Sequence, residues 1–83
     1  MEKIRVYSKE NCMPCKATVR QLGKAGLAFE VIMLEDNEEK RNDFIEQGFV
    51  QSPVVEYGEE RWSGFRPDRI EELAKIAREA AEE

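Results

Sequence analysis

The chain has 83 residues, and we expect residues 1–83 to form one compact domain. Its formal net charge of −5 argues against a general nucleic-acid binder and against a protein that binds anionic membranes. No apolar run follows Met1 and Glu2, so we expect neither a secretory signal nor a membrane anchor. Two cysteines are too few for a secreted disulfide scaffold. We therefore expect a cytoplasmic monomer.

The first half of the chain alternates between strand-like and helix-like patterns. Apolar and polar residues alternate over 4–7, which predicts a half-buried strand. A helix is predicted over 13–22, ended by Gly23 and Gly26. The segment 29–34 is too apolar for a surface strand, which predicts a strand in the centre of the sheet.

A second helix is predicted in the middle of the chain. Asp36 or Asn37 is expected to cap its start, because short polar side chains accept from the first free backbone N–H groups. Phe44 and Ile45 are predicted to anchor this helix, and Gly48 to end it.

The last third predicts a hairpin and a helix. Residues 53–57 and 61–63 are strand-like and are separated by a turn at Gly58 and Glu59. Pro67 is suited to the first turn of a final helix. Its predicted buried stripe consists of Ile70, Leu73, Ile76, Ala77 and Ala80.

The order of elements is therefore βαβαββα. A helical crossover favours parallel pairing of the first two strands, and the hairpin is then added antiparallel. We predict an α/β fold of the thioredoxin-like, glutaredoxin type, with a four-stranded mixed sheet flanked by three helices.

Cys12-Met13-Pro14-Cys15 is the chain's strongest chemical signal. Residues i and i+3 lie about one helical turn apart, which lets two sulfurs meet at disulfide distance. Cys12 falls at a helix N-terminus, where the thiolate is favoured, so we predict that it is the exposed nucleophile. Cys15 lies on the buried helix face and is predicted to resolve the mixed disulfide. Lys9, three residues before Cys12, is either an ordinary solvated lysine or a cation that stabilises the Cys12 thiolate.

A metal site is the principal alternative use of this cysteine pair. Structural zinc takes four Cys or His ligands, whereas the chain has two Cys and no His. Only a dimer sharing two such pairs could complete a zinc site or a bridged iron–sulfur cluster. We therefore predict no metal, and keep a metal- or cluster-binding module and a non-catalytic interaction domain as alternatives.

Three segments together resemble the glutaredoxin branch of the thioredoxin superfamily. They are Tyr7-Ser8-Lys9, Cys12-Met13-Pro14-Cys15 and Ser52-Pro53-Val54-Val55. The string Trp62-Ser63-Gly64-Phe65-Arg66-Pro67-Asp68 further resembles the signature of NrdH-type redoxins. The chain departs from that family at Glu10-Asn11, where members often carry Pro, and at Pro14, where they commonly carry Gln.

The resemblance implies a thiol–disulfide oxidoreductase with no bound cofactor. Electrons would come from NADPH through thioredoxin reductase and go to the large subunit of a class Ib ribonucleotide reductase. The alternative is a glutathione-dependent glutaredoxin that reduces protein disulfides. Relatives that use glutathione have small residues where this chain has Trp62 and Phe65, which argues against that alternative.

The resemblance also implies site residues beyond the two cysteines. It implies a cis Ser52–Pro53 bond beside the cysteines, where the backbone of Ser52 can pair with a substrate strand. Lys9, Met13 and Pro14 would lie in the partner-binding surface. The expected supports of the loop near the active site, which also take part in partner recognition, are Trp62, Ser63, Gly64, Phe65 and Arg66. Asp68 is predicted to be a first-turn helix carboxylate.

Overall fold

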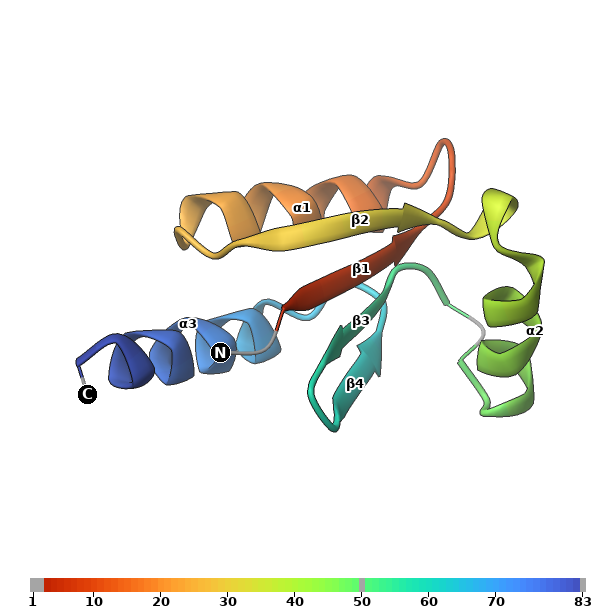
Figure 1. The fold of residues 1–83 in the computed structure, drawn as a ribbon. Helices are drawn as coiled ribbons and strands as arrows, with labels where there is room; N and C mark the ends of the chain where they lie inside the picture. The colour runs from red at the N-terminus through yellow and green to blue at the C-terminus, as the bar shows by residue number, and fades with distance from the viewer. Residues whose placement is uncertain (1–2, 50, 83) are drawn as a thin grey trace.

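The computed structural model describes residues 3–49 and 51–82, and its elements follow the predicted order (Figure 1). A short 3-10 helix, η1, was not predicted and lies directly before the second helix. The elements are β1 (Ile4–Ser8), α1 (Met13–Lys24), β2 (Phe29–Met33), η1 (Leu34–Asp36), α2 (Glu38–Glu46), β3 (Val54–Tyr57), β4 (Glu60–Ser63) and α3 (Pro67–Glu82).

The four strands form one mixed sheet in the order β2-β1-β3-β4. β1 pairs with β2 in parallel and with β3 antiparallel, and β3 pairs antiparallel with β4. The predicted fold class is therefore confirmed, including the parallel first pair and the antiparallel hairpin.

The prediction that β2 is central is wrong, because β1 and β3 occupy the middle of the sheet. Val31 in β2 is 44% exposed. The strand is apolar for another reason: its two faces pack on different clusters. Phe29 contacts the main core, and Ile32 contacts the smaller cluster on the opposite face. Partial cover on each face is enough to make the composition of this edge strand resemble that of a central strand.

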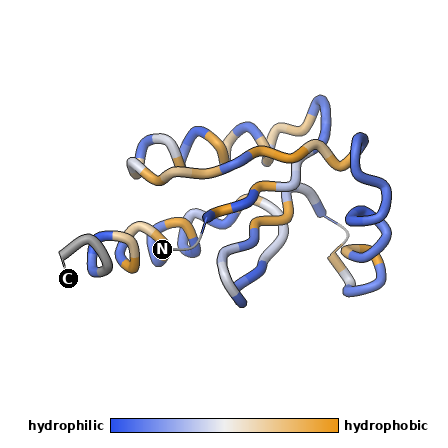
Figure 2. The backbone as a smooth tube through the Cα atoms, in the orientation of Figure 1, coloured by the Kyte–Doolittle hydropathy of each residue, from blue (hydrophilic) through white to orange (hydrophobic). Residues whose placement is uncertain are grey.

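Alternating residues of the sheet pack into two separate hydrophobic cores, one on each face. Val6 and Val55 face α1 and α3, where they pack with Leu22, Ile70 and Leu73. On the other face, four buried side chains form the cluster under α2: Tyr7, Leu34, Phe44 and Val54. In Figure 2 apolar segments run along the strands, whereas α2 is largely hydrophilic.

The helix termini were only partly predictable. Gly23 lies inside α1, and the helix ends after Lys24. Gly26 has φ +73°, and the N–H of Leu27 donates to the carbonyl of Leu22 at 3.1 Å, closing the helix. Asn37 occupies the N-cap of α2, but within the described residues its side chain makes no capping hydrogen bond.

Two isoleucines that were predicted to hold helices against the sheet are exposed. Ile45 in α2 is 51% exposed, so Phe44 alone anchors that helix. Gly48 ends it as predicted, with φ +90°. Ile76 is exposed because the C-terminal part of α3 runs past the end of the sheet (Figure 1). Ala77 is half-buried against the core, while Ala80 lies outside the residues whose side chains the structure describes.

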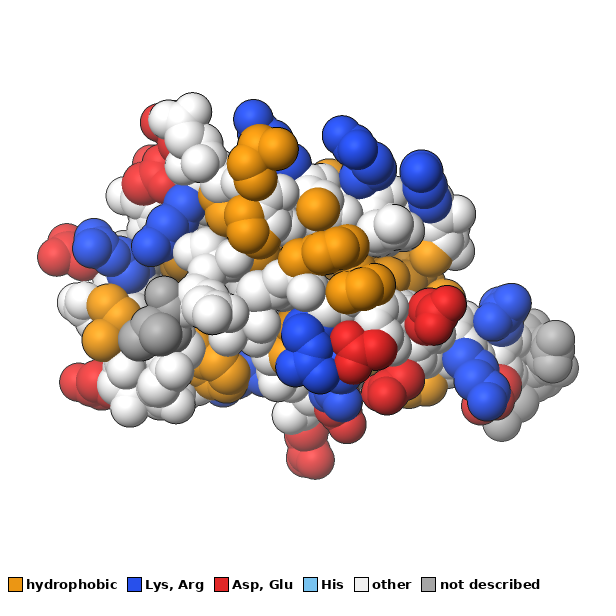
Figure 3. Space-filling model, turned by 180° about the vertical axis from the view of Figure 1, so that it is seen from behind, with side chains coloured by type: hydrophobic (Ala, Val, Ile, Leu, Met, Phe, Trp, Pro, Cys, Tyr) orange, Lys and Arg blue, Asp and Glu red, His pale blue; other side chains and the backbone are white. Residues whose placement is uncertain are grey.

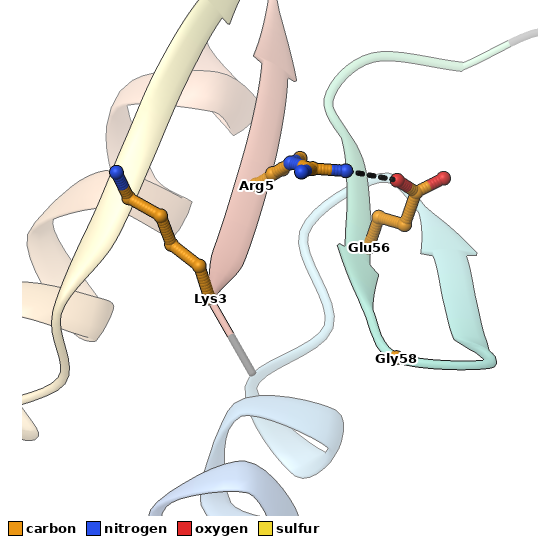
Figure 4. Close-up of a pocket in the computed structure, with 4 residues that line it drawn as sticks. All are labelled: Lys3, Arg5, Glu56 and Gly58. Atoms are coloured by element: carbon orange, nitrogen blue, oxygen red, sulfur yellow. Dashed lines mark ion pairs between the residues drawn. The ribbon is translucent and has the colours of Figure 1, made fainter. Parts of the chain in front are cut away.

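The part of this sheet face that α2 leaves uncovered carries a row of charged residues, each paired with the next across the strands. Glu30, Arg5, Glu56 and Arg61 follow one another across the four strands, alternating in sign. Glu56 is buried, with Arg61 at 2.7 Å and Arg5 at 3.6 Å. Figure 4 shows the Arg5–Glu56 pair in a hollow also lined by Lys3 and Gly58. On the part of this face that α2 leaves uncovered, the row pairs a buried carboxylate with two cations.

Candidate active site

The cysteine pair forms a disulfide at the N-terminus of α1. Cys12 is the N-cap residue, and Pro14 lies in the first turn, where its missing N–H costs no helical hydrogen bond. The Cα atoms of Cys12 and Cys15 are 5.2 Å apart. The first turn contains no acidic residue, so the positive end of the helix dipole is not neutralised within that turn.

The two cysteines have different surroundings, as predicted. Cys12 is half-buried, whereas Cys15 is only 2% exposed. The backbone N–H of Cys15 donates to Cys12 Sγ at 3.2 Å. In the reduced protein the same donor would face a Cys12 thiolate, and a hydrogen bond to a charged acceptor is stronger than one to a neutral acceptor. Of the two sulfurs, that of Cys12 is therefore the more accessible from solvent.

Three loops meet at the same end of the sheet as the cysteines. Tyr7 pairs with Val54, so the residues after β1 lie beside those before β3. Val54 in turn pairs with Ser63, which brings the segment after β4 to the same place. Lys9, Ser52 and Gly64 follow or precede these paired positions. The fold thus gathers predicted site residues that are distant in sequence.

The Ser52–Pro53 peptide bond is cis, as the resemblance implies. Pro53 is buried, and its carbonyl accepts a hydrogen bond from the N–H of Gly64 at 2.8 Å. Ser52 is half-buried and shares a hollow of about 250 Å³ with Lys9 and Arg41. This hollow is also lined by Leu34, Phe44, Ile45, Phe49, Gln51 and Val54.

Residues 62–68 divide between core and surface. Trp62 is 5% exposed and packs in the main core, a position from which it can support the loop but not contact a partner directly. The Cζ atom of Arg69 lies 5.3 Å from the centre of the indole ring. The packed indole holds the end of β4 against the core. Ser63 is half-buried, whereas Phe65 is exposed and available to a partner.

Arg66 makes a two-point contact with Asp68. Its Nε and Nη2 donate to the carboxylate oxygens at 3.2 and 3.0 Å. These hydrogen bonds lower the pKa of Asp68 and raise the pKa of Arg66. Asp68 lies in the first turn of α3, as predicted. Both side chains are exposed, so this pair shapes the surface beside Phe65 rather than the core.

Met13 and Pro14 are exposed on the first turn of α1, and Met13 is the more prominent at 73% exposure. An exposed thioether next to a reactive sulfur is suited to contact with varied partners. Lys9 is also exposed, and the hollow that it lines places it on the Ser52 side of the site.

Sequence reasoning missed two residues that shape these loops. The carboxylate of Glu35 accepts from the backbone N–H of Glu10 at 2.9 Å, which ties η1 to the loop before Cys12. In that loop Asn11 has φ +56°, a conformation that Asn tolerates better than most residues. Gln51 lies against Gly64: a Cβ on Gly64 would stand 2.7 Å from Gln51 Oε1. Neither contact carries a signal in the sequence, because the partners are far apart along the chain.

Within residues 3–49 and 51–82, no group of three or more His, Cys, Asp or Glu side chains could hold a metal ion. Over the same residues, no helix has the length and apolar character needed to cross a bilayer.

Comparison with known proteins gives a consistent picture. The glutaredoxin family model matches residues 4–62. The chain is 40% identical over 74 residues to the glutaredoxin-like protein NrdH of Lactococcus lactis subsp. lactis, covering 89% of this chain and 99% of that protein. The solved structure of the NrdH-redoxin of Escherichia coli is similar, with a TM-score of 0.83 and 41% identity, over 86% of this chain and 93% of that one. A glutaredoxin from Archaeoglobus fulgidus has a TM-score of 0.69 at 32% identity, over 88% and 86% of the two chains.

Proposed function

Because this chain belongs to the glutaredoxin family, and within it to the NrdH-type redoxins, we propose that it is an electron carrier between thioredoxin reductase and ribonucleotide reductase. It is a thiol–disulfide oxidoreductase with the Cys12–Cys15 pair at its centre. The proposal adds the donor, NADPH through thioredoxin reductase, and the acceptor, the large subunit of a class Ib enzyme. In this proposal the protein is a cytoplasmic monomer that holds no cofactor and binds neither nucleic acid nor a membrane.

The difference in burial between the two cysteines supports a two-step exchange. The Cys12 thiolate attacks one sulfur of a substrate disulfide, forming a mixed disulfide and releasing the other substrate sulfur as a thiolate, which is then protonated. Cys15, as a thiolate, then attacks Cys12 Sγ and expels the second substrate thiol. The Cys12–Cys15 disulfide forms, and two electrons pass to the substrate. The reductase then returns two electrons, from NADPH, to this disulfide.

Residues 62–68 support the choice of thioredoxin reductase as the donor. The bulky Phe65 lies beside the loop that holds Gly64 on Pro53. The similar redoxin of Escherichia coli is described as a glutaredoxin-like protein with a thioredoxin-like activity profile. Both observations favour a protein reductant over glutathione.

The hollow beside Ser52 supports the alternative, a glutathione-dependent glutaredoxin. Its 250 Å³ volume and its two cations, Lys9 and Arg41, fit a small anionic thiol such as glutathione. The glutaredoxin from Archaeoglobus fulgidus has the same overall fold. The two candidates therefore differ in their reductant and share the chemistry of the cysteines.

One assay separates the two candidates. NADPH consumption is followed with a small disulfide substrate, either with thioredoxin reductase or with glutathione and glutathione reductase. We expect turnover with thioredoxin reductase alone, and none in either reaction for Cys12→Ser. Turnover with glutathione alone would overturn the proposed donor and establish the alternative. If thioredoxin reductase supports turnover, the small disulfide is then replaced by a class Ib ribonucleotide reductase as the oxidant.

A further inference from the structure

Helix α1 carries three cations along its exposed side, which we call the basic ridge: Lys16, Arg20 and Lys24. They are spaced four residues apart, so they lie near one another along the same side of the helix. Residues 11–29 contain no Asp or Glu, although the whole chain has a net charge of −5. Positive charge is therefore concentrated on this helix.

The basic ridge is not used by the fold. All three side chains are exposed, and none forms a salt bridge with any residue of 3–49 or 51–79, whose side chains the structure describes. By contrast, Arg5 and Arg61 pair with Glu56 across the sheet. In Figure 3 some of the Lys and Arg side chains are spaced along the upper rim, on the side where α1 runs in Figure 1, with hydrophobic side chains below them. These cations are available to a partner.

The basic ridge begins at the reactive sulfurs. Lys16 directly follows Cys15, and the exposed Met13 is three residues before Lys16 and seven before Arg20, a spacing that places it on the same side of α1. From Lys16 to Lys24 the helix rises about 12 Å. A partner that presents its sulfur to Cys12 therefore has a path over Met13 and along the ridge. About four residues of extended chain span that length.

We propose that the basic ridge binds an acidic, extended segment next to the disulfide of the partner protein. This inference rests on the proposed function, because it concerns how a protein disulfide is chosen. Carboxylates on the partner match the three unpaired cations. Exposed charges of this kind act mainly on the rate of encounter and on the choice of partner.

The test uses disulfide-bonded peptides with four Glu residues before or after the disulfide, and matched peptides with four Gln. Stoichiometrically reduced protein is mixed with each peptide, and samples are quenched and alkylated to follow oxidation of Cys12 and Cys15. Each rate is divided by that of the same peptide with dithiothreitol, because neighbouring carboxylates change the reactivity of the disulfide itself. Uncharged hydroxyethyl disulfide measures exchange without any flanking segment.

The test variant is Arg20→Gln/Lys24→Gln, which leaves out Lys16 because that residue lies nearest the sulfurs. The matched control is Lys3→Gln/Arg5→Gln, which also removes one Lys and one Arg. Arg5 lies on the opposite sheet face from the residues that pack against α1, and Lys3 lines the same hollow (Figure 4). Urea unfolding of both variants verifies that they are folded.

At about 10 mM salt, the native protein is expected to favour the Glu peptides by roughly threefold to tenfold, and to lose this preference near 1 M salt. The test variant should lose most of the preference, and the control should keep it. Equal rates for Glu and Gln peptides, or equal losses in both variants, would overturn the inference. Dimerisation at low salt that Arg20→Gln/Lys24→Gln abolishes would also overturn it, because a second copy would then occupy the ridge. If the reduced native protein does not exchange with hydroxyethyl disulfide, the proposed oxidoreductase function itself is wrong, independently of the ridge.

Discussion

The backbone N–H of Gly64 donates a hydrogen bond to the carbonyl oxygen of Pro53 at 2.8 Å. This bond joins the segment after β4 to the cis-proline loop, two parts of the chain that flank the cysteine site. Gly64 has φ +80°, in the left-handed region that favours glycine. The backbone conformation at Gly64 therefore sets how Phe65 and Arg66 are presented beside the site.

Gly64→Ala is expected to destabilise the protein by about 1–2 kcal/mol, because a Cβ is unfavourable at positive φ. The added Cβ would also meet Gln51 Oε1 at 2.7 Å, although that flexible side chain can move away. The shift is measured by urea unfolding.

Gly23→Ala is the control for this substitution, since Gly23 lies within α1 and, among the described residues, a Cβ added there would point into open space. That change should stabilise the protein by roughly 0.5–1 kcal/mol through higher helix propensity. Equal effects of the two substitutions would contradict the argument from backbone conformation.

Cys15→Ser should stop the exchange after its first step. Cys12 can still form a mixed disulfide, but no second sulfur is available to resolve it. Mass spectrometry after incubation with a disulfide peptide should detect one peptide bound per chain, released by dithiothreitol. Cys12→Ser should trap far less, because Cys15 is almost fully buried. Equal trapping by the two variants would show that burial does not assign the roles.

Reduced Cys12 is expected to ionise below the ordinary cysteine pKa of about 8.5, because it lies at a helix N-terminus with a backbone donor 3.2 Å from its sulfur. The rate of alkylation as a function of pH, measured in Cys15→Ser, should therefore have its midpoint below that value. Lys9→Gln should move the midpoint upward if Lys9 supplies part of the stabilisation. A midpoint at or above about pH 8.5 would contradict the role of the helix terminus.

The sequence predicted those features that depend on local patterns. The spacing of Cys12 and Cys15, the proline in the first turn, and the periodicity of strands and helices each require only neighbouring residues. The element order then limited the topology, because helical crossovers and hairpins pair strands in characteristic ways. The fold class and the different burial of the two cysteines followed from these features.

The remaining features depend on tertiary contacts. Whether β2 is an edge or a central strand depends on which side of β1 accepts β3, and apolar composition does not decide this. Ile45 and Ile76 satisfy helical periodicity but lie where no other element covers them. The bond from Glu10 to Glu35 spans 25 residues and gives no pattern in either segment. The string from Trp62 to Asp68 did not show which of its side chains are buried, and Trp62 faces the core whereas Phe65 is exposed.

The Arg61–Glu56 and Arg66–Asp68 ion pairs are expected to contribute very different amounts to stability. Arg61→Ala should destabilise the protein by about 1–3 kcal/mol, because Glu56 is buried and would keep only Arg5 at 3.6 Å. Arg66→Ala should change stability far less, because Arg66 and Asp68 are both exposed to solvent. Urea unfolding at neutral pH compares the two variants directly.

The Arg66–Asp68 pair also predicts the direction of a small pH effect. The pKa of Asp68 is lowered by the hydrogen bond from Arg66, so the pair's stabilisation is present above the unfolded-state pKa of Asp. It is lost as pH falls through the lower folded-state pKa. The stability difference between the native protein and Arg66→Ala should therefore shrink as the pH is lowered into the acid range. A difference that grows on acidification would show that Arg66 stabilises the protein through another contact.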